Sequence, residues 1–288
     1  MAKQTVSRTA LGAAICRMIE QYQPEKTRLF DDPVAKELVG GPIRFLMHFS
    51  GMRNLTVQQT DAVAKGIYGV QVCRTRFIDD VVQTAISQGI KQLVILGAGY
   101  DTRPYRLPQI KNVKVFEVDL PAVQEDKKKK LQKYLGRLPD HVTFVPIDFD
   151  MQTLEAVFSV TAFNSGKPAI FVWEGVTQYI SEEAVRQTLA FVGRSAPGSI
   201  LVFTYVLKSI IERRSNIPNA NHLMDVAAKQ SPWIFGIEPS GIQDFLKPYH
   251  LALIADVGNV DYQEKYLKPM ERNLVIFEGE RIAQAIVS

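Results

Sequence analysis

Apolar runs and amphipathic segments alternate through the middle of the chain. Five runs rich in Val, Ile, Leu and Phe have the length of buried strands, and they lie at residues 92–96, 113–118, 142–146, 169–173 and 199–206. The segments between them include helical patterns at 121–135 and 181–192. Strands that alternate with helices predict right-handed β-α-β units, and therefore a doubly wound, mostly parallel α/β sheet covered on both faces.

The pattern after residue 206 predicts the rest of the sheet and one insertion. Residues 251–257 and 273–278 are apolar runs, which we expect to form the sixth and seventh strands. Residues 207–240 break the alternation, and about 35 residues is long for a plain connection. We expect this segment to form a helical lid that shapes a substrate pocket.

The first ninety residues show helical patterns and no alternating strand. Apolar residues recur at helical spacing in the segments 9–21, 34–39 and 74–88. We therefore expect a helical cap over residues 1–90, joined to a core over residues 91–288 in one structural unit. Arg74 and Arg76 open the third of these helices, where the helix dipole does not favour cations, so one of them is a candidate ligand-binding residue.

The composition is that of a globular protein without a membrane span. Lys and Arg exceed Asp and Glu by only 34 to 30, which does not indicate nucleic-acid binding, and the lysines at 127–130 are interpreted as a solvated helix face. Two cysteines are too few for a disulfide framework and favour a reducing cytoplasm. No apolar run approaches the ~20 residues of a membrane span, and we expect no signal peptide.

Glycines and acids follow the predicted strands where a parallel sheet binds its ligands. Gly97 and Gly99 end the first strand and permit a sharp turn close to a ligand. Asp119 lies 20 residues beyond Gly99, the spacing of an acid that binds ribose hydroxyls. Asp148 with Phe149 follows the third strand, and Glu174 follows the fourth. Together they predict a site for a ribose, an adenine and a cationic group.

The pattern around the glycine turn favours a nucleotide without phosphate groups. Thr102 occupies the third position of a would-be dinucleotide fingerprint, and no phosphate-binding loop is present. S-adenosylmethionine is cationic and carries no phosphate, so it suits an acidic pocket, and Arg74 is a candidate for its carboxylate. An NAD-linked oxidoreductase and a non-catalytic S-adenosylmethionine-binding module remain as alternatives. No metal is expected.

Four longer motifs carry a resemblance to a known family. They are Leu96-Gly-Ala-Gly-Tyr-Asp-Thr-Arg-Pro-Tyr-Arg-Leu107, Phe116-Glu-Val-Asp-Leu-Pro121, Val145-Pro-Ile-Asp-Phe149 and Trp173-Glu-Gly-Val-Thr-Gln-Tyr-Ile180. The chain resembles the class I S-adenosylmethionine-dependent methyltransferases of the leucine carboxyl methyltransferase-like family, in its bacterial and fungal small-molecule branch. The resemblance implies a seven-stranded Rossmann-like methyltransferase sheet. It also implies a cofactor site formed by Arg17, Arg74, Gly97, Gly99, Asp119, Asp148, Phe149 and Glu174.

The methyl acceptor is less defined by the sequence. A carboxylate acceptor is ionised at neutral pH and needs no base, whereas an alcohol or a phenol needs one. His222 in the predicted lid is the only histidine in a plausible place for a base, and Tyr179 and Tyr205 follow or end strands beside the pocket. We therefore expect an O-methyltransferase that acts on a carboxyl or hydroxyl group of a small molecule, as a monomer or homodimer, without nucleic-acid or membrane partners.

Overall fold

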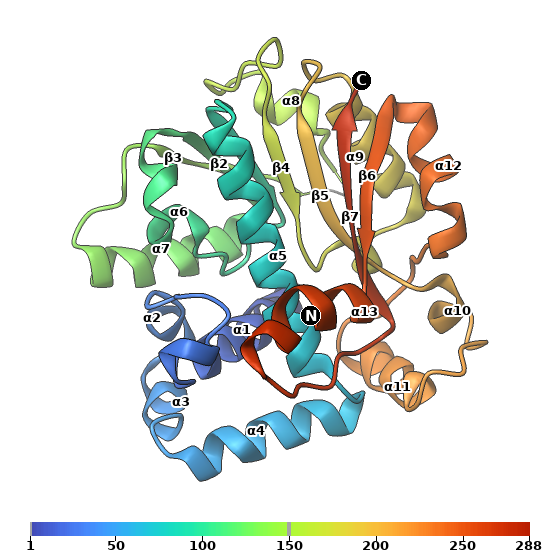
Figure 1. Cartoon of the computed structure of the whole chain (residues 1–288). Helices are drawn as coiled ribbons and strands as arrows, with labels where there is room; N and C mark the ends of the chain where they lie inside the picture. The colour runs from blue at the N-terminus through green and yellow to red at the C-terminus, as the bar shows by residue number, and fades with distance from the viewer. Residues whose placement is uncertain (1, 149–150) are drawn as a thin grey trace.

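A seven-stranded sheet forms the centre of the molecule (Figure 1). The computed structural model describes residues 2–148 and 151–288, with residues 2–8 placed by their backbone alone. The strand order is β3-β2-β1-β4-β5-β7-β6, and only β7 runs antiparallel to its neighbours. The strands are β1 (Gln92–Leu96), β2 (Lys114–Asp119), β3 (Val142–Pro146), β4 (Ile170–Trp173), β5 (Ile200–Val206), β6 (Leu251–Val257) and β7 (Glu280–Val287). The first six strands confirm the sequence prediction.

The predicted position of the seventh strand is wrong. Residues 273–278 form no strand, and β7 begins two residues later at Glu280. The apolar run instead packs against the N-terminal helices, where Ile276 and Phe277 are buried and the amide of Phe277 donates to the carbonyl of Gly66 at 2.9 Å. Both segments are apolar, so hydrophobicity alone did not separate a buried loop from the adjacent strand.

Helices cover both faces of the sheet. Side chains alternate along each strand, so Leu93 and Ile95 of β1 join one core while Val94 and Leu96 join the other. The helices after β1 are α6 (Arg103–Arg106), α7 (Pro121–Leu135), α8 (Leu154–Phe158), α9 (Glu182–Gly193), α10 (Lys208–Ile211), α11 (Ala220–Gln230), α12 (Ile242–Leu246) and α13 (Asn259–Tyr262). None of the helices described is both long and apolar enough to cross a membrane.

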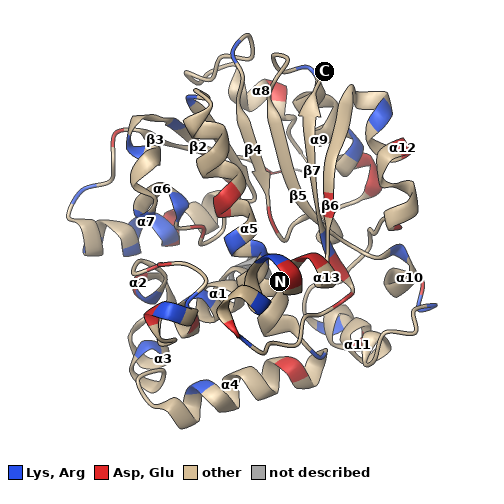
Figure 2. Cartoon of the chain, viewed as in Figure 1, with Lys and Arg blue, Asp and Glu red and all other residues tan. Residues whose placement is uncertain are grey.

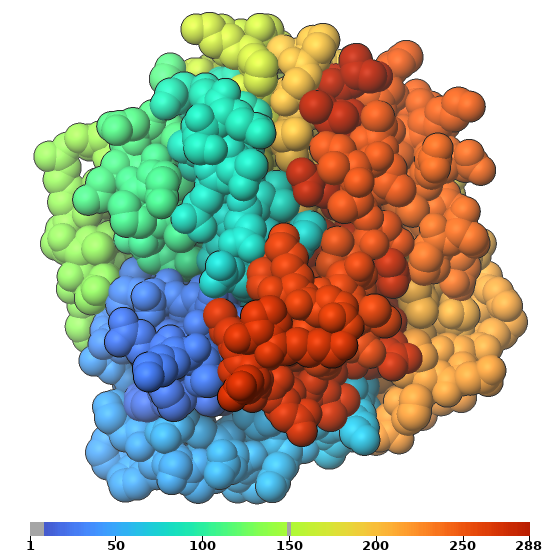
Figure 3. Space-filling model, in the orientation of Figure 1, coloured from blue at the N-terminus to red at the C-terminus, as the bar shows by residue number. Residues whose placement is uncertain are grey.

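Five helices precede the sheet. The first four gather at the end of the sheet where its central strands have their carboxyl ends, and the fifth runs from there along one face of the sheet (Figure 1). The five helices are α1 (Ala2–Glu20), α2 (Ala35–Val39), α3 (Gly41–Leu46), α4 (Ser50–Val63) and α5 (Ile67–Ser87). Figure 3 shows the first four helices in shades of blue beside the orange-red segment that connects β6 to β7, and Arg272 of that segment pairs with Glu20 of α1. Because α5 begins at Ile67, Arg74 and Arg76 lie inside the helix, and the argument from their place at its start is wrong.

The lysine run on α7 is not uniformly solvated. Lys127 is 1% exposed, and its Nζ lies 2.7 Å from Oε2 of Glu117 on β2. The hydroxyl of Tyr105 donates to Oε1 of the same carboxylate at 2.9 Å. The solvated-face interpretation is therefore wrong for Lys127, because a buried acid on the neighbouring strand compensates its charge.

Candidate functional site

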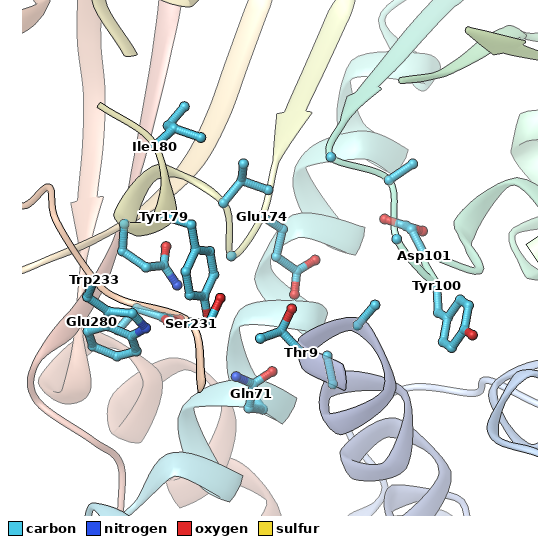
Figure 4. A pocket seen from close by; sticks show the side chains of 18 of the residues that line it. Thr9, Gln71, Tyr100, Asp101, Glu174, Tyr179, Ile180, Ser231, Trp233 and Glu280 are labelled. Atoms are coloured by element: carbon cyan, nitrogen blue, oxygen red, sulfur yellow. The ribbon is translucent and has the colours of Figure 1, made fainter. Parts of the chain in front are cut away.

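A cavity of about 660 Å³ lies at the carboxyl ends of β1, β2 and β4. Most of the residues predicted for the site line it, namely Arg17, Arg74, Gly97, Gly99, Asp119, Asp148, Glu174 and Tyr179. Phe149 lies outside the described residues. Figure 4 shows Tyr179 and Trp233 on one side of the cavity and Asp101 on the other, with Glu174 between them. The cavity therefore has two distinct ends.

The glycine turn after β1 requires glycine for two reasons. Gly97 and Gly99 have φ angles of +64° and +42°, which side chains with a Cβ rarely adopt. A Cβ on Gly97 would also lie 2.4 Å from Cγ2 of Val176, the residue two positions after Glu174. The turn thus packs directly against the loop after β4, and together they form the floor of the cavity.

Asp119 fixes the glycine turn from the end of β2. One of its carboxylate oxygens accepts from the amide of Gly99, and the other accepts from the amide of Leu120 at 2.6 Å. Burial raises the pKa of Asp119, although these amide hydrogen bonds act in the opposite direction. Asp119 is 6% exposed and lines the cavity, and a carboxylate can accept more hydrogen bonds than these two.

Arg74 crosses the cavity wall between two carboxylates. Its Nε donates to Glu174 at 2.9 Å, and its Nη1 donates to both oxygens of Glu280 at 2.7 and 2.8 Å. These hydrogen bonds leave Nη2 without a partner among the described residues. Nη2 lies next to Gly175, where a Cβ would be only 3.1 Å away. Glycine at position 175 therefore lets the guanidinium reach the cavity.

Arg74 belongs to a continuous chain of buried ion pairs, which we call the arginine–carboxylate network. Its members are Arg17, Asp32, Arg106, Asp79, Arg103, Asp101, Glu174, Arg74 and Glu280. No side chain among them is more than 13% exposed. Figure 2 shows acidic and basic residues meeting around α1 and α5, where the network joins the helices to the sheet.

Arg103 is the branching point of the network. It pairs with Asp79 at 2.8 Å, with Asp101 and with Glu174 at 2.8 Å. Burial raises the pKa of Glu174, but Arg103 and Arg74 lower it more, so that it lies below the usual carboxyl range. Burial also raises the pKa of Asp101, but the neighbouring cations, chiefly Arg103, lower it more, so that the net shift is downward. Both carboxyls are therefore charged at neutral pH.

Aromatic side chains line the other end of the cavity, where Ser231 and Glu280 also lie (Figure 4). Tyr179 and Trp233 meet edge to face with ring centroids 6.4 Å apart, and Phe277 completes this wall. Trp233 belongs to the predicted insertion, and the amide of the next residue, Ile234, donates to the carbonyl of Gln178 at 2.8 Å. Residues of the insertion thus line the cavity directly, while burial raises the pKa of Tyr179.

Two candidates for the acceptor pocket lie elsewhere. Tyr205 is fully buried, its hydroxyl donates to Asp256 at 2.8 Å, and it does not line the cavity. The alternation of β5 turns Thr204, not Tyr205, toward the site, where its hydroxyl accepts from the amide of Gly175 at 2.7 Å. His222 is exposed on α11, away from the cavity lining. Both placements contradict the sequence prediction.

Three residues of the site were missed by sequence reasoning. Arg103 and Gly175 lie inside two of the motifs that carry the family resemblance. The motifs therefore marked these positions as part of the site, but the residue types alone did not indicate what each residue does there. Glu280 carried none, because the seventh strand was placed before it. It is the first residue of β7 and lies opposite Val206 at the end of β5, which brings its carboxylate to the cavity.

Comparisons of sequence agree with this geometry. The family model described as leucine carboxyl methyltransferase matches residues 10–193. A Bacillus subtilis (strain 168) protein with the provisional name S-adenosyl-L-methionine-dependent methyltransferase YktD is 26% identical over 99% of both chains. A Frankia alni protein with a provisional name of the same kind is 34% identical over 69% of both chains.

Solved structures share the fold at low sequence identity. A crystal structure of a provisionally assigned methyltransferase from Thermobifida fusca superimposes with a TM-score of 0.58 at 16% identity, covering 88% of this chain and 93% of that one. A protein of the DUF574 family from Streptomyces avermitilis gives 0.58 at 14% identity, covering 96% and 97%. The family match, the relatives and the site agree, and the chain belongs to the leucine carboxyl methyltransferase family of S-adenosylmethionine-dependent methyltransferases.

Proposed function

We propose that this methyltransferase transfers the methyl group to an oxygen atom, on a carboxyl or hydroxyl group of a small molecule. The observation that carries the proposal is the division of one cavity into an acidic end and an aromatic end. The acidic end suits a cation without phosphates, and the aromatic end suits an organic acceptor. The description of the matching family model, which names a carboxyl methyltransferase, supports an oxygen acceptor.

The residues at the acidic end fit the cofactor group by group. Asp119 would accept from the ribose hydroxyls, and Asp148 would accept from the adenine amine. Nη2 of Arg74 would bind the methionine carboxylate, with Arg17 as a second cation nearby. Glu174 would face the methionine ammonium. Phe149, outside the described residues, stays a predicted adenine contact.

S-adenosylmethionine, when bound, supplies an electrophilic methyl group for in-line displacement. The protein contributes alignment of the acceptor and exclusion of water from the cavity. No histidine lies among the described residues that line the cavity, and Arg74 and Arg103 neutralise Glu174. Burial raises the pKa of Tyr179, so its phenol is protonated at neutral pH and is not a base there. With no histidine among the described lining residues and with Tyr179 protonated, a carboxylate acceptor, which needs no base, is favoured.

Two segments outside the sheet have proposed roles in this reaction. Residues 1–90 act as a cap, because Arg17 of α1 and Arg74 of α5 reach the cavity from that side. Residues 207–240 act as a lid, because Ser231, Pro232 and Trp233 cover the aromatic end. The lid is therefore the segment in which we expect acceptor specificity to be encoded.

Transfer of a tritiated methyl group from S-adenosylmethionine to a metabolite extract tests the proposal. We expect labelled methyl esters or methyl ethers, and base-labile label would identify an ester. A Trp233→Ala variant should retain binding of S-adenosylhomocysteine but lose most of the transfer. Label on nitrogen or carbon alone would refute the oxygen acceptor, and unchanged transfer by the variant would refute the assignment of the aromatic end.

A further inference from the structure

One buried polar atom at the aromatic end of the cavity is left without a partner. Gln178 lines the cavity and is 3% exposed, and its Oε1 has no hydrogen-bond partner among the described residues. Buried polar side chains are hydrogen-bonded in most proteins, because an unpaired one has lost its water and gained nothing in return. An unpaired amide oxygen in a cavity wall therefore indicates a position where a ligand supplies the missing donor.

Contacts on two sides hold Gln178 in place. It lies in the short 3₁₀ helix Thr177–Tyr179, directly after the loop that begins with Glu174. Its backbone carbonyl accepts from the amide of Ile234 at 2.8 Å, so the insertion is attached at this residue. Its side chain forms a hydrogen bond with Tyr179 that lowers the pKa of the phenol, as donation from Nε2 to the phenol oxygen does. With Nε2 used in this way, Oε1 is the atom left to bind a ligand.

The hydroxyl of Tyr179 complements this oxygen. The side chains of Trp233 and Gln178 both hydrogen-bond to it and lower its pKa, although burial raises the pKa more. A phenol oxygen that accepts from two donors still has its own hydrogen to donate. The aromatic end thus offers a ligand one donor, the hydroxyl of Tyr179, and one acceptor, Oε1 of Gln178, on consecutive residues.

A plain carboxylate cannot use both groups, because it only accepts hydrogen bonds. An acid with a hydroxyl group on the carbon next to its carboxyl can use both: one carboxylate oxygen accepts from Tyr179, and the hydroxyl donates to Gln178. The second carboxylate oxygen then takes the methyl group, with S-adenosylhomocysteine as the leaving group.

We propose that Gln178 is a specificity-determining residue, whose side-chain oxygen selects organic acids that carry a hydrogen-bond donor beside the carboxyl group. This inference rests on the proposed methylation of oxygen and names the class of acid within it. The orphaned oxygen carries it, since a plain acid in the same place would leave Oε1 buried and unpaired.

Two pairs of acids that differ by one hydroxyl group test the proposal. Mandelate is compared with phenylacetate, and 3-phenyllactate with 3-phenylpropanoate, and kcat/KM is measured for each acid with tritiated S-adenosylmethionine. The wild-type protein should methylate the hydroxy acid of each pair at least about tenfold more efficiently. Gln178→Met, which keeps the length of the side chain without its polar atoms, should bring this ratio close to one.

Gln178→Glu separates recognition from a structural role. It keeps an acceptor oxygen, so it should retain the preference for the hydroxy acids, while its negative charge should lower kcat/KM for both acids of a pair. S-adenosylhomocysteine and 5′-methylthioadenosine, which lacks the amino-acid part of the cofactor, should bind to both variants as they bind to the wild type. Their binding is the control for folding, because none of the contacts assigned to the cofactor involves Gln178.

The outcomes that contradict the inference are distinct from failure of the proposed function. A wild-type ratio near one, or no transfer to either hydroxy acid, would overturn the inference, and this comparison needs no variant to fold. An unchanged ratio in Gln178→Met would remove Gln178 from the explanation. Label on oxygen in the metabolite extract, without a preference within the pairs, would refute this inference alone. Label on nitrogen or carbon alone would refute the proposed function as well.

Discussion

Replacing Gly175 by alanine tests whether Arg74 holds the cofactor through Nη2. Gly175 has a φ angle of +68°, and an added Cβ would lie 3.1 Å from Nη2 and 3.7 Å from Cζ of Arg74. The guanidinium cannot retreat freely, because Glu174 and Glu280 hold its Nε and Nη1 at 2.9 and 2.7 Å. The substitution should therefore lower the stability of the fold through the backbone. Separately, it should lower the affinity for the cofactor through the displaced guanidinium.

The two costs can be estimated separately. A left-handed backbone conformation costs a residue with a Cβ about 1–2 kcal/mol, which lowers the free energy of unfolding. A shift of Nη2 by a few tenths of an ångström weakens a charge-assisted hydrogen bond to the methionine carboxylate, a bond of about 1.5–3 kcal/mol. We therefore expect S-adenosylhomocysteine to bind about tenfold more weakly, a loss of about 1.4 kcal/mol.

Gly198→Ala is the matched control for the backbone cost. Gly198 has a φ angle of +85°, and nothing lies within 4 Å of its would-be Cβ. Urea unfolding should show a similar loss of stability in both variants, while calorimetry should show weaker S-adenosylhomocysteine binding only in Gly175→Ala. Wild-type affinity in Gly175→Ala, with the stability loss present, would refute the role of Nη2. Equal weakening of 5′-methylthioadenosine would show instead that the whole cavity had been distorted.

Three further predictions follow from single residues. Asp119→Ala should weaken S-adenosylhomocysteine binding at least tenfold, about 1.4 kcal/mol, because a charge-assisted contact and the anchor of the glycine turn are both lost; calorimetry showing less than a twofold change would contradict it. The lowered pKa values of Asp101 and Glu174 mean that their charged forms stabilise the fold above about pH 4, and that this stability is lost as the pH falls further. Urea unfolding from pH 7 to pH 3 should show that loss, and Glu174→Gln should flatten it; parallel curves would exclude Glu174 as a source. Burial raises the pKa of the Cys16 and Cys73 thiols to about 11 and about 12, so neither should react with a thiol reagent at pH 8 until the protein unfolds, and rapid labelling of the native protein would contradict their burial.

Local sequence patterns and the geometry of parallel sheets were enough to predict most of the fold and the acidic end of the site. Apolar runs located six strands, and the helical pattern at 181–192 located α9, which Ser181 caps by accepting from the amide of Ala184. The acids were predictable because the carboxyl ends of parallel strands gather at one edge. The alternative of an NAD-linked oxidoreductase, disfavoured by Thr102, does not survive the family match.

Ion pairs and packing contacts between residues that are far apart in the chain explain what the sequence could not predict. The partners of Arg74 are 100 and 206 residues away, so nothing local distinguishes it from a surface arginine. The sequence around Lys127 indicates a solvated side chain, and only the fold shows that Glu117 lies beside it. The sequence pattern places the start of this helix at residue 74, whereas α5 begins at Ile67. Gly69 stands inside α5, where an added Cβ would lie 2.1 Å from the carbonyl oxygen of Val275. Such contacts depend on register, which composition and periodicity do not determine.

The position of β7 has a consequence for synthesis of the protein. β7 follows the other six strands in the chain, yet it lies between β5 and β6 and pairs with both. A nascent chain can pair β1 to β5 as they leave the ribosome, but β6 has no strand to join until residues 280–287 have emerged. Because Glu280 arrives with β7, the wall around Arg74 is also completed last. A ribosome-bound chain stalled before residue 280 should therefore expose an open strand edge to chaperones and bind no cofactor.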